Sequence, residues 1–163
     1  MRLITFLLIC LIPFSVMAGT ITGTVVRITD GDTVVVLDAN KVQYKIRLVG
    51  IDAPEKKQAY GKKSKENLSD LVAGKHVVVE YDKVDRYKRV LGKILLNSKD
   101  MNLEQIKSGM AWHYKKYQKE QSQSDRMLYS EAEIGAREAR RGLWQDPEPI
   151  PPWEYRKLKK PKS

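Results

Sequence analysis

Five short segments with β-strand character lie in the first part of the chain, and they constrain the fold more than any other feature. Each is rich in β-branched or apolar residues, and turn-forming residues separate the first three. In the third segment Val42 and Ile46 fall on one face and Arg47 on the other, which is the period of a half-buried strand. The strands are expected at residues 20–28, 33–37, 42–49, 76–81 and 88–96.

Three other stretches have the apolar spacing of helices. Residues 58–73 lie between the third and fourth expected strands. Residues 102–108 follow with Asn102 as the expected N-cap, and residues 122–141 carry an expected packing face that begins at Leu128. A helix after the third of five strands is the order of a small Greek-key barrel of the OB type. We therefore expect an α+β fold that is mainly β, with three helices; a generic α+β domain is the alternative.

The first 18 residues have the three parts of a secretory signal peptide. These are a basic start at Arg2, an apolar core, and a small residue, Ala18, before the expected cut. Pro13 interrupts an apolar run that is already shorter than the roughly 20 residues needed to cross a bilayer. We expect cleavage after Ala18, export to the periplasm or the extracellular space, and no stable membrane anchor.

Cysteine content and net charge narrow the function classes. The single cysteine, Cys10, lies in the expected signal peptide. The exported chain would therefore have no disulfide, no thiol nucleophile and no cysteine-ligated zinc. The formal net charge is +10, of which Arg2 supplies only one unit. Such a surplus favours polyanionic partners, namely nucleic acid, anionic lipid or acidic polysaccharide.

Three polar clusters, at residues 30–33, 52–55 and 85–89, stand at the ends of expected strands. Taken singly, each is compatible with an ordinary turn or strand exit. Taken together, they combine carboxylates with arginines in a basic protein. Carboxylate and carbonyl oxygens suit Ca²⁺, and guanidinium groups bind phosphate bidentately. A metal ion and two arginines at one phosphate would stabilise the charge that develops as water attacks.

The same clusters carry a resemblance to a known family. The motifs TDGDT at 29–33, RLVGIDAPE at 47–55 and DRYKR at 85–89 occur in that order, and RRGLW follows at 140–144. In this the chain resembles the staphylococcal nuclease (thermonuclease) family over roughly residues 20–144. The resemblance implies an OB-fold, Ca²⁺-dependent endonuclease. Such an enzyme is a phosphodiesterase that cuts DNA and RNA, in single-stranded or frayed regions, at the bond between phosphorus and the 5′ oxygen.

The resemblance also implies a set of metal ligands. Asp32 and Asp52 would bind Ca²⁺ through their side chains, and residue 53 through its backbone carbonyl. Many members have threonine at that position and this chain has Ala53. Because the ligand is a main-chain oxygen, the difference should cost little. Asp30 would lie just outside the direct ligands.

Catalytic roles follow from the same resemblance. Glu55 would orient or deprotonate the attacking water. Arg47 and Arg89 would bind the scissile phosphate, and Arg89 is the residue expected to assist the leaving oxygen. The division of acid and base work between Glu55 and Arg89 stays open at this point.

Substrate-binding residues are expected around the phosphate. Tyr87 and Tyr117 match family positions that flank the bound nucleotide, and Arg86 is also expected to bind substrate. Aromatic side chains beside basic ones suit unstacked bases and backbone phosphates. Trp112 and Tyr114 belong either to this surface or to the core. The two histidines lack metal-ligand spacing and are expected to be structural or exposed.

The domain expected from these patterns is a monomeric nuclease-like OB fold at residues 19–145. It is followed by a proline-rich basic tail at 146–163, expected to be extended and flexible, which either contacts phosphate or aids solubility. The main alternative function is a non-catalytic OB-fold module that binds nucleic acid. Such a module has no need of Asp32, Asp52 and Glu55, because acidic groups weaken binding to a polyanion. A cationic envelope protein is a third reading, supported only by the tail and the net charge.

Overall fold

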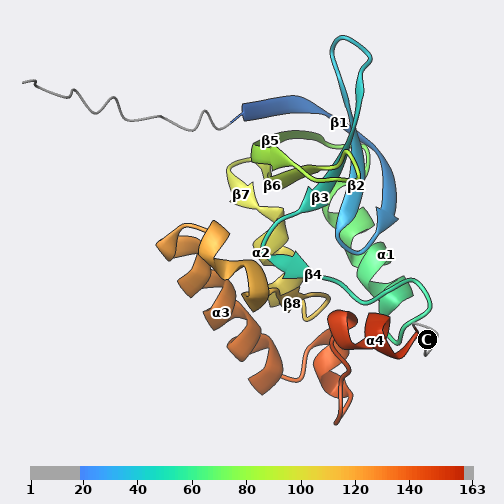
Figure 1. Ribbon diagram of the computed structural model, residues 1–163, viewed down its shortest axis with the longest axis vertical. Helices are drawn as coiled ribbons and strands as arrows, with labels where there is room; N and C mark the ends of the chain where they lie inside the picture. The colour runs from blue at the N-terminus through green and yellow to red at the C-terminus, as the bar shows by residue number, and fades with distance from the viewer. Residues whose placement is uncertain (1–18, 160–163) are drawn as a thin grey trace, which may run out of the picture.

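The computed structural model describes residues 19–159 (Figure 1). The expected signal peptide and the last four residues lie outside the described residues. Within these residues, eight strands and four α-helices follow one another in the order β1 (Gly19–Asp30), β2 (Thr33–Asp38), β3 (Gln43–Leu48), β4 (Ile51–Asp52), α1 (Gly61–Val72), β5 (His76–Val84), β6 (Val90–Leu96), β7 (Lys99–Asp100), α2 (Met101–Lys107), β8 (Trp112–His113), α3 (Gln123–Glu138) and α4 (Pro152–Leu158). Two 3₁₀ helices, Lys115–Glu120 and Gly142–Gln145, flank α3. No helix within residues 19–159 is long and apolar enough to span a membrane.

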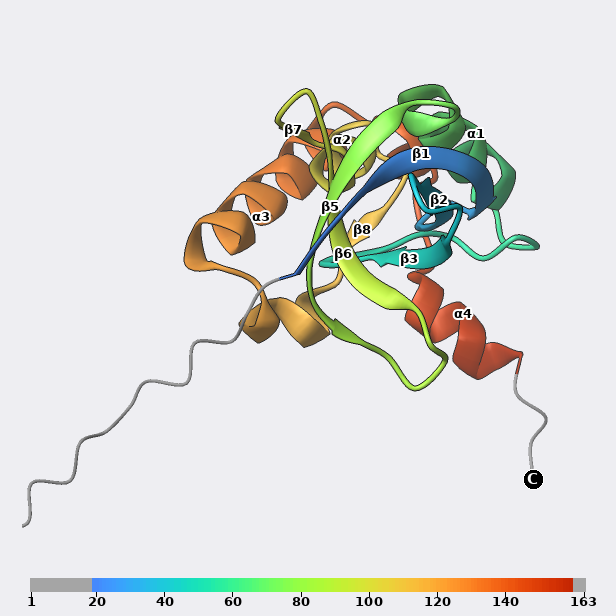
Figure 2. The same cartoon turned by 90° about the horizontal axis from the view of Figure 1, so that it is seen from above.

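Five strands close into a barrel, as the sequence predicts. Their order is β3-β2-β1-β5-β6, and a pairing of β3 with β6 closes the ring. The closing pair is parallel, with Ile46 opposite Val90 and Leu48 opposite Gly92, whereas its neighbours are antiparallel. Register shifts in β1 on either side of Arg27 and Ile28 mark bulges, which bend a strand and increase its twist. Figure 2 shows β1 and β5 curving around the barrel.

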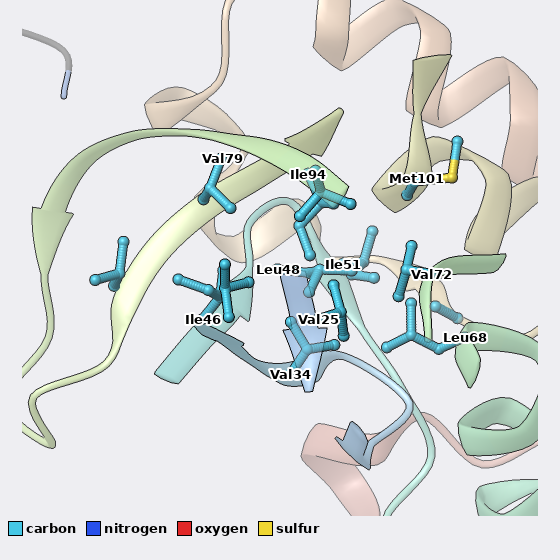
Figure 3. Close-up of a cluster of buried hydrophobic side chains, with 14 of the residues drawn as sticks. Val25, Val34, Ile46, Leu48, Ile51, Leu68, Val72, Val79, Ile94 and Met101 are labelled. Carbon is cyan, nitrogen blue, oxygen red and sulfur yellow. The ribbon is translucent and has the colours of Figure 1, made fainter. Parts of the chain in front are cut away.

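The barrel interior is filled by the apolar faces of the strands (Figure 3). Val34, Ile46 and Ile94 are fully buried, and so are Leu68 and Val72 from α1, which closes one end of the barrel. The alternation in β3 explains this arrangement, because Ile46 and Leu48 point inward while Arg47 between them points to the opposite face. The apolar interior thus fixes the side on which Arg47 must lie.

Helix α2 begins one residue earlier than the sequence suggests. Its N-cap is Asp100, whose side chain accepts a hydrogen bond from the Leu103 backbone amide. The expected cap, Asn102, is instead buried, and its amide group donates to the carbonyls of Val49 and Gly92. The prediction failed because Asn102 and Asp100 are both good caps, and only the barrel supplies partners for a buried amide.

Helix α3 packs through a face shifted from the one expected to begin at Leu128: Ala136 is buried and Ala132 packs against the core, but Leu128 is 48% exposed. The buried residues are Tyr129, Glu133 and Ala136. The hydroxyl of Tyr129 donates to Asp100 Oδ2 at 2.7 Å, and Glu133 Oε1 accepts from the His113 backbone amide. Polar partners on the barrel therefore decide which face of α3 is buried.

The prediction of an extended tail was wrong for residues 152–158, which form α4. Pro152 occupies the first turn, where its missing N–H costs nothing. The helix is attached to the loop before α1, because Gln58 Nε2 donates to the Ile150 carbonyl at 2.6 Å and the Tyr155 hydroxyl donates to the Lys57 carbonyl at 3.1 Å. In Figure 1, α4 (red) lies next to this loop.

Closure of the barrel can be tested by a cavity at the β3–β6 pairing. Ile46→Ala should lower the free energy of unfolding by about 2–5 kcal/mol, because a fully buried isoleucine leaves a cavity when it is truncated. The matched control is Ile134→Ala on α3, where the side chain is 51% exposed and the change should stay within about 0.5 kcal/mol. Urea unfolding measures both, and equal losses would contradict the proposed core.

Candidate functional site

A cleft of about 1060 Å³ runs along one side of the barrel and collects every residue that the sequence predicts for the site. Its walls come from the β1–β2 turn, the end of β3 with β4, and the β5–β6 turn. These are the three segments that carry the motifs. The predicted residues that line it are Asp30, Asp32, Arg47, Asp52, Ala53, Glu55, Arg86, Tyr87, Arg89 and Tyr117.

Asp32 is placed by a tight turn between β1 and β2. Its backbone amide donates to Asp30 Oδ1 at 3.1 Å, and its Oδ2 accepts from the Ala53 amide at 2.8 Å. Gly31 allows α1 to approach, since a Cβ there would lie 2.0 Å from Ser64 Oγ. The turn therefore brings Asp32 against the end of β4, where Asp52 stands.

Arg47 connects the two carboxylates. Its guanidinium lies 2.8 Å from Asp32 Oδ2 and 2.9 Å from Asp52 Oδ1. It also donates to the carbonyls of Leu48 and Ile51, both at 3.2 Å. The Arg47 side chain is only 14% exposed, so this guanidinium is held by four partners in a largely dry setting. Buried like charges are tolerated here because they share one cation.

Burial raises the pKa of Asp32 to about 7, with Arg47 opposing this shift and the nearby Asp30 and Asp52 adding to it. The positive charge of Arg47 therefore does not fully offset the burial of this carboxylate. A bound cation would favour its ionised form, as any close opposite charge does.

The donor set fits a hard divalent cation. Asp32 and Asp52 line the same cleft, and the backbone amide of Ala53, the residue after Asp52, donates to Asp32 Oδ2. No three His, Cys, Asp or Glu side chains within residues 19–159 gather into a metal-ligand cluster. Two carboxylates would therefore need a backbone carbonyl and water to complete the shell, which is the mixed oxygen set that Ca²⁺ accepts.

Arg89 lies in the same cleft but faces a different acid. Its Nε and a terminal nitrogen each lie 2.8 Å from Asp85 Oδ2, so the turn that carries Arg89 also orients it. Its guanidinium is 5.5 Å from the centre of the Tyr87 ring, and that of Arg86 is 4.8 Å away. Tyr87 is 63% exposed, which leaves an aromatic surface between two cations.

The aromatic residues near β8 divide between core and cleft. Trp112 is buried beside Trp144, with ring centres 4.3 Å apart. Tyr114 lines the cleft, and its ring lies 5.0 Å from that of Tyr117, which is 44% exposed. Sequence left both Trp112 and Tyr114 open, and the structure separates them. The histidines are structural or exposed as expected: His76 is exposed, and His113 is buried and paired with Gln121.

The sequence analysis placed Arg156 only in the basic tail, among possible phosphate contacts, whereas it is the one residue of α4 that lines the cleft. Its guanidinium lies 2.7 Å from Asp52 Oδ2, 3.2 Å from Asp52 Oδ1 and 2.7 Å from Glu55 Oε1. Nothing in the local pattern distinguishes it from the lysines around it. The available signal was Pro152 followed by apolar and aromatic residues, which is compatible with a helix start.

Comparisons with known proteins show which family the chain resembles. A family model described as staphylococcal nuclease homologue matches residues 45–146. A protein of Escherichia coli named uncharacterized endonuclease is 42% identical over 154 residues, covering 94% of this chain and 96% of the relative. A micrococcal nuclease of Shigella flexneri is 40% identical over 147 residues, covering 85% and 82%.

A plant protein supplies a partial match. The staphylococcal-like nuclease CAN1 of Arabidopsis thaliana is 41% identical over 118 residues, which cover 72% of this chain and 35% of the relative. The family model begins within β3 and includes the β3–β4 and β5–β6 segments of the cleft, whereas the β1–β2 turn with Asp32 precedes it. From its closed five-strand barrel, its motif-bearing cleft and these matches, the chain belongs to the family of staphylococcal nuclease homologues.

Proposed function

We propose that this protein is a Ca²⁺-dependent endonuclease that hydrolyses DNA and RNA at the bond between phosphorus and the 5′ oxygen. One observation carries the proposal. The carboxylates of Asp32, Asp52 and Glu55 line a single cleft together with Arg47 and Arg89, in a protein whose formal net charge is +10. On a surface that only bound nucleic acid, these acids would weaken the binding.

Asp32, Asp52 and the carbonyl of Ala53 are the residues that would hold the cation. A bound Ca²⁺ supplies Lewis-acid stabilisation of the charge on the phosphate oxygens. The Ala53 amide already donates to Asp32, so the position of this backbone is coupled to that of the carboxylate. The replacement of threonine by alanine leaves this main-chain contact available.

Glu55 is suited to accept a proton from the attacking water. Its side chain is 42% exposed, and it therefore meets solvent where Asp52, at 1%, does not. The loop that carries it is fixed by a hydrogen bond from the Glu55 amide to Gln58 Oε1 at 3.0 Å. A base must be within reach of the proton that it removes, and a fixed backbone with a solvent-facing carboxylate meets that need.

Arg47 and Arg89 supply fixed positive charge on the cleft walls. Arg47 is oriented by β3 and by Asp32, and Arg89 by Asp85. Charge that is oriented before the reaction stabilises a transition state without reorganisation. Arg89 would assist the leaving 5′ oxygen, while Arg86, Tyr87 and Tyr117 would contact the neighbouring nucleotides through charge and stacking. Exposed rings favour single-stranded or frayed substrate, whose bases are free to stack.

Export is part of the same proposal and is supported by the sequence of residues 1–18. The mature protein would begin at Gly19, act as a monomer, and work in the periplasm or outside the cell.

Metal dependence is tested by hydrolysis of labelled single-stranded DNA and RNA. Activity should appear with added Ca²⁺ and be abolished by excess chelator, and it should return when Ca²⁺ is restored, because Asp32 and Asp52 need a cation to act on phosphate. Hydrolysis that is undiminished in chelator would exclude the metal role. Binding without hydrolysis under every divalent cation would instead favour the non-catalytic module.

The role of Arg89 is tested by Arg89→Ala. This change should lower kcat by roughly 10²- to 10³-fold, the loss expected when one preorganised charge-stabilising group is removed. Arg27→Ala is the control, since Arg27 is exposed on β1 and outside the cleft, and it removes the same charge. A similar kcat in both variants would remove Arg89 from the reaction.

A further inference from the structure

Arg156 enters the cleft from α4, which lies outside the three sequence segments that carry the motifs. It is 40% exposed, and its guanidinium bonds both oxygens of Asp52 and one oxygen of Glu55. These are the carboxylates to which the proposed function assigns the cation and the water. A role for Arg156 therefore has to be compatible with both assignments.

The position of Arg156 is fixed by the packing of α4. The ring of Trp153 stacks on that of Tyr114, with centres 5.4 Å apart and planes 14° from parallel, and it meets Trp112 edge to face at 5.6 Å. Tyr155 is tied to the Lys57 carbonyl, in the loop that also carries Glu55. The helix is thus packed on the wall of the cleft, and these contacts hold the backbone of Arg156 beside the cleft.

Two guanidinium groups contact the carboxylate of Asp52. Arg47 bonds its Oδ1 and Arg156 bonds both Oδ1 and Oδ2, so a cation on Asp52 would compete with a guanidinium. Arg47 is 14% exposed and is also held by Asp32 and two carbonyls. Arg156 is more exposed and has no backbone acceptor among the contacts of its guanidinium. Arg156 is therefore the guanidinium that a cation would displace from Asp52.

An arginine that releases Asp52 but stays on α4 remains within the cleft. Its planar group, which matches the two oxygens of a carboxylate, matches two oxygens of a phosphate equally well. We propose that Arg156 is a third phosphate-binding arginine of this site, held by Asp52 and Glu55 until cation and substrate replace those contacts. This inference rests on the proposed function, because it needs the cation to bind at Asp52.

The proposal predicts opposite effects of one substitution on two affinities. In Arg156→Gln the competing charge is gone, so Ca²⁺ should bind about tenfold more tightly. At saturating Ca²⁺ the same variant should bind a single-stranded oligonucleotide with a hydrolysis-resistant backbone about tenfold more weakly. Calorimetry measures the first affinity and fluorescence anisotropy the second. The matched control is Lys157→Gln, the next residue of α4, which is exposed and outside the cleft.

The outcomes separate this proposal from the one on which it rests. Tighter Ca²⁺ together with weaker oligonucleotide binding, both relative to Lys157→Gln, supports Arg156 as a phosphate ligand. Tighter Ca²⁺ with unchanged oligonucleotide binding overturns it, since Arg156 would then only compete with the cation. Equal behaviour of the two variants also overturns it. If Ca²⁺ binds neither the wild type nor a variant, the proposed function itself fails.

Discussion

The site depends on one buried ion-pair arrangement, in which Arg47 holds Asp32 and Asp52 together. Neither carboxylate could stay ionised and buried alone, because an unpaired buried charge costs several kcal/mol. The position of Arg47 is set by barrel closure, since it pairs with Thr33 on β2 and Leu91 on β6. Folding of the barrel and assembly of the site are thus the same event.

The barrel builds the cleft by bringing turns that are separate in the sequence to one side of the molecule. The β1–β2 turn carries Asp32, the exit of β3 carries Asp52 and Glu55, and the β5–β6 turn carries Arg89. Helix α4 adds a fourth wall through Arg156. In the proposed function, the excess of positive charge attracts a polyanion and the buried acids bind a cation. That function would account for the carboxylates in the cleft of a basic protein.

Sequence patterns predicted the barrel and the members of the cleft, because strand alternation and ordered motifs are local signals. These patterns failed where contacts between residues distant in the sequence determine the structure. Asn102 is buried because the barrel offers it two carbonyls, Tyr129 faces inward because Asp100 accepts its hydroxyl, and α4 forms where Trp153 can stack on Tyr114. Arg156 was assigned to the tail and not to the cleft for the same reason, since no spacing rule connects it to Asp52, from which it is separated by 104 positions.

If Asp32 and Asp52 form a cation site, Ca²⁺ should bind there directly. Calorimetric titration of Ca²⁺ into the wild type, Asp52→Asn and Asp70→Asn separates a site from general charge, because Asp70 is exposed on α1 and outside the cleft. We expect saturable binding in the wild type and in Asp70→Asn, and its loss in Asp52→Asn. Equal binding of Ca²⁺ to all three proteins would contradict the account.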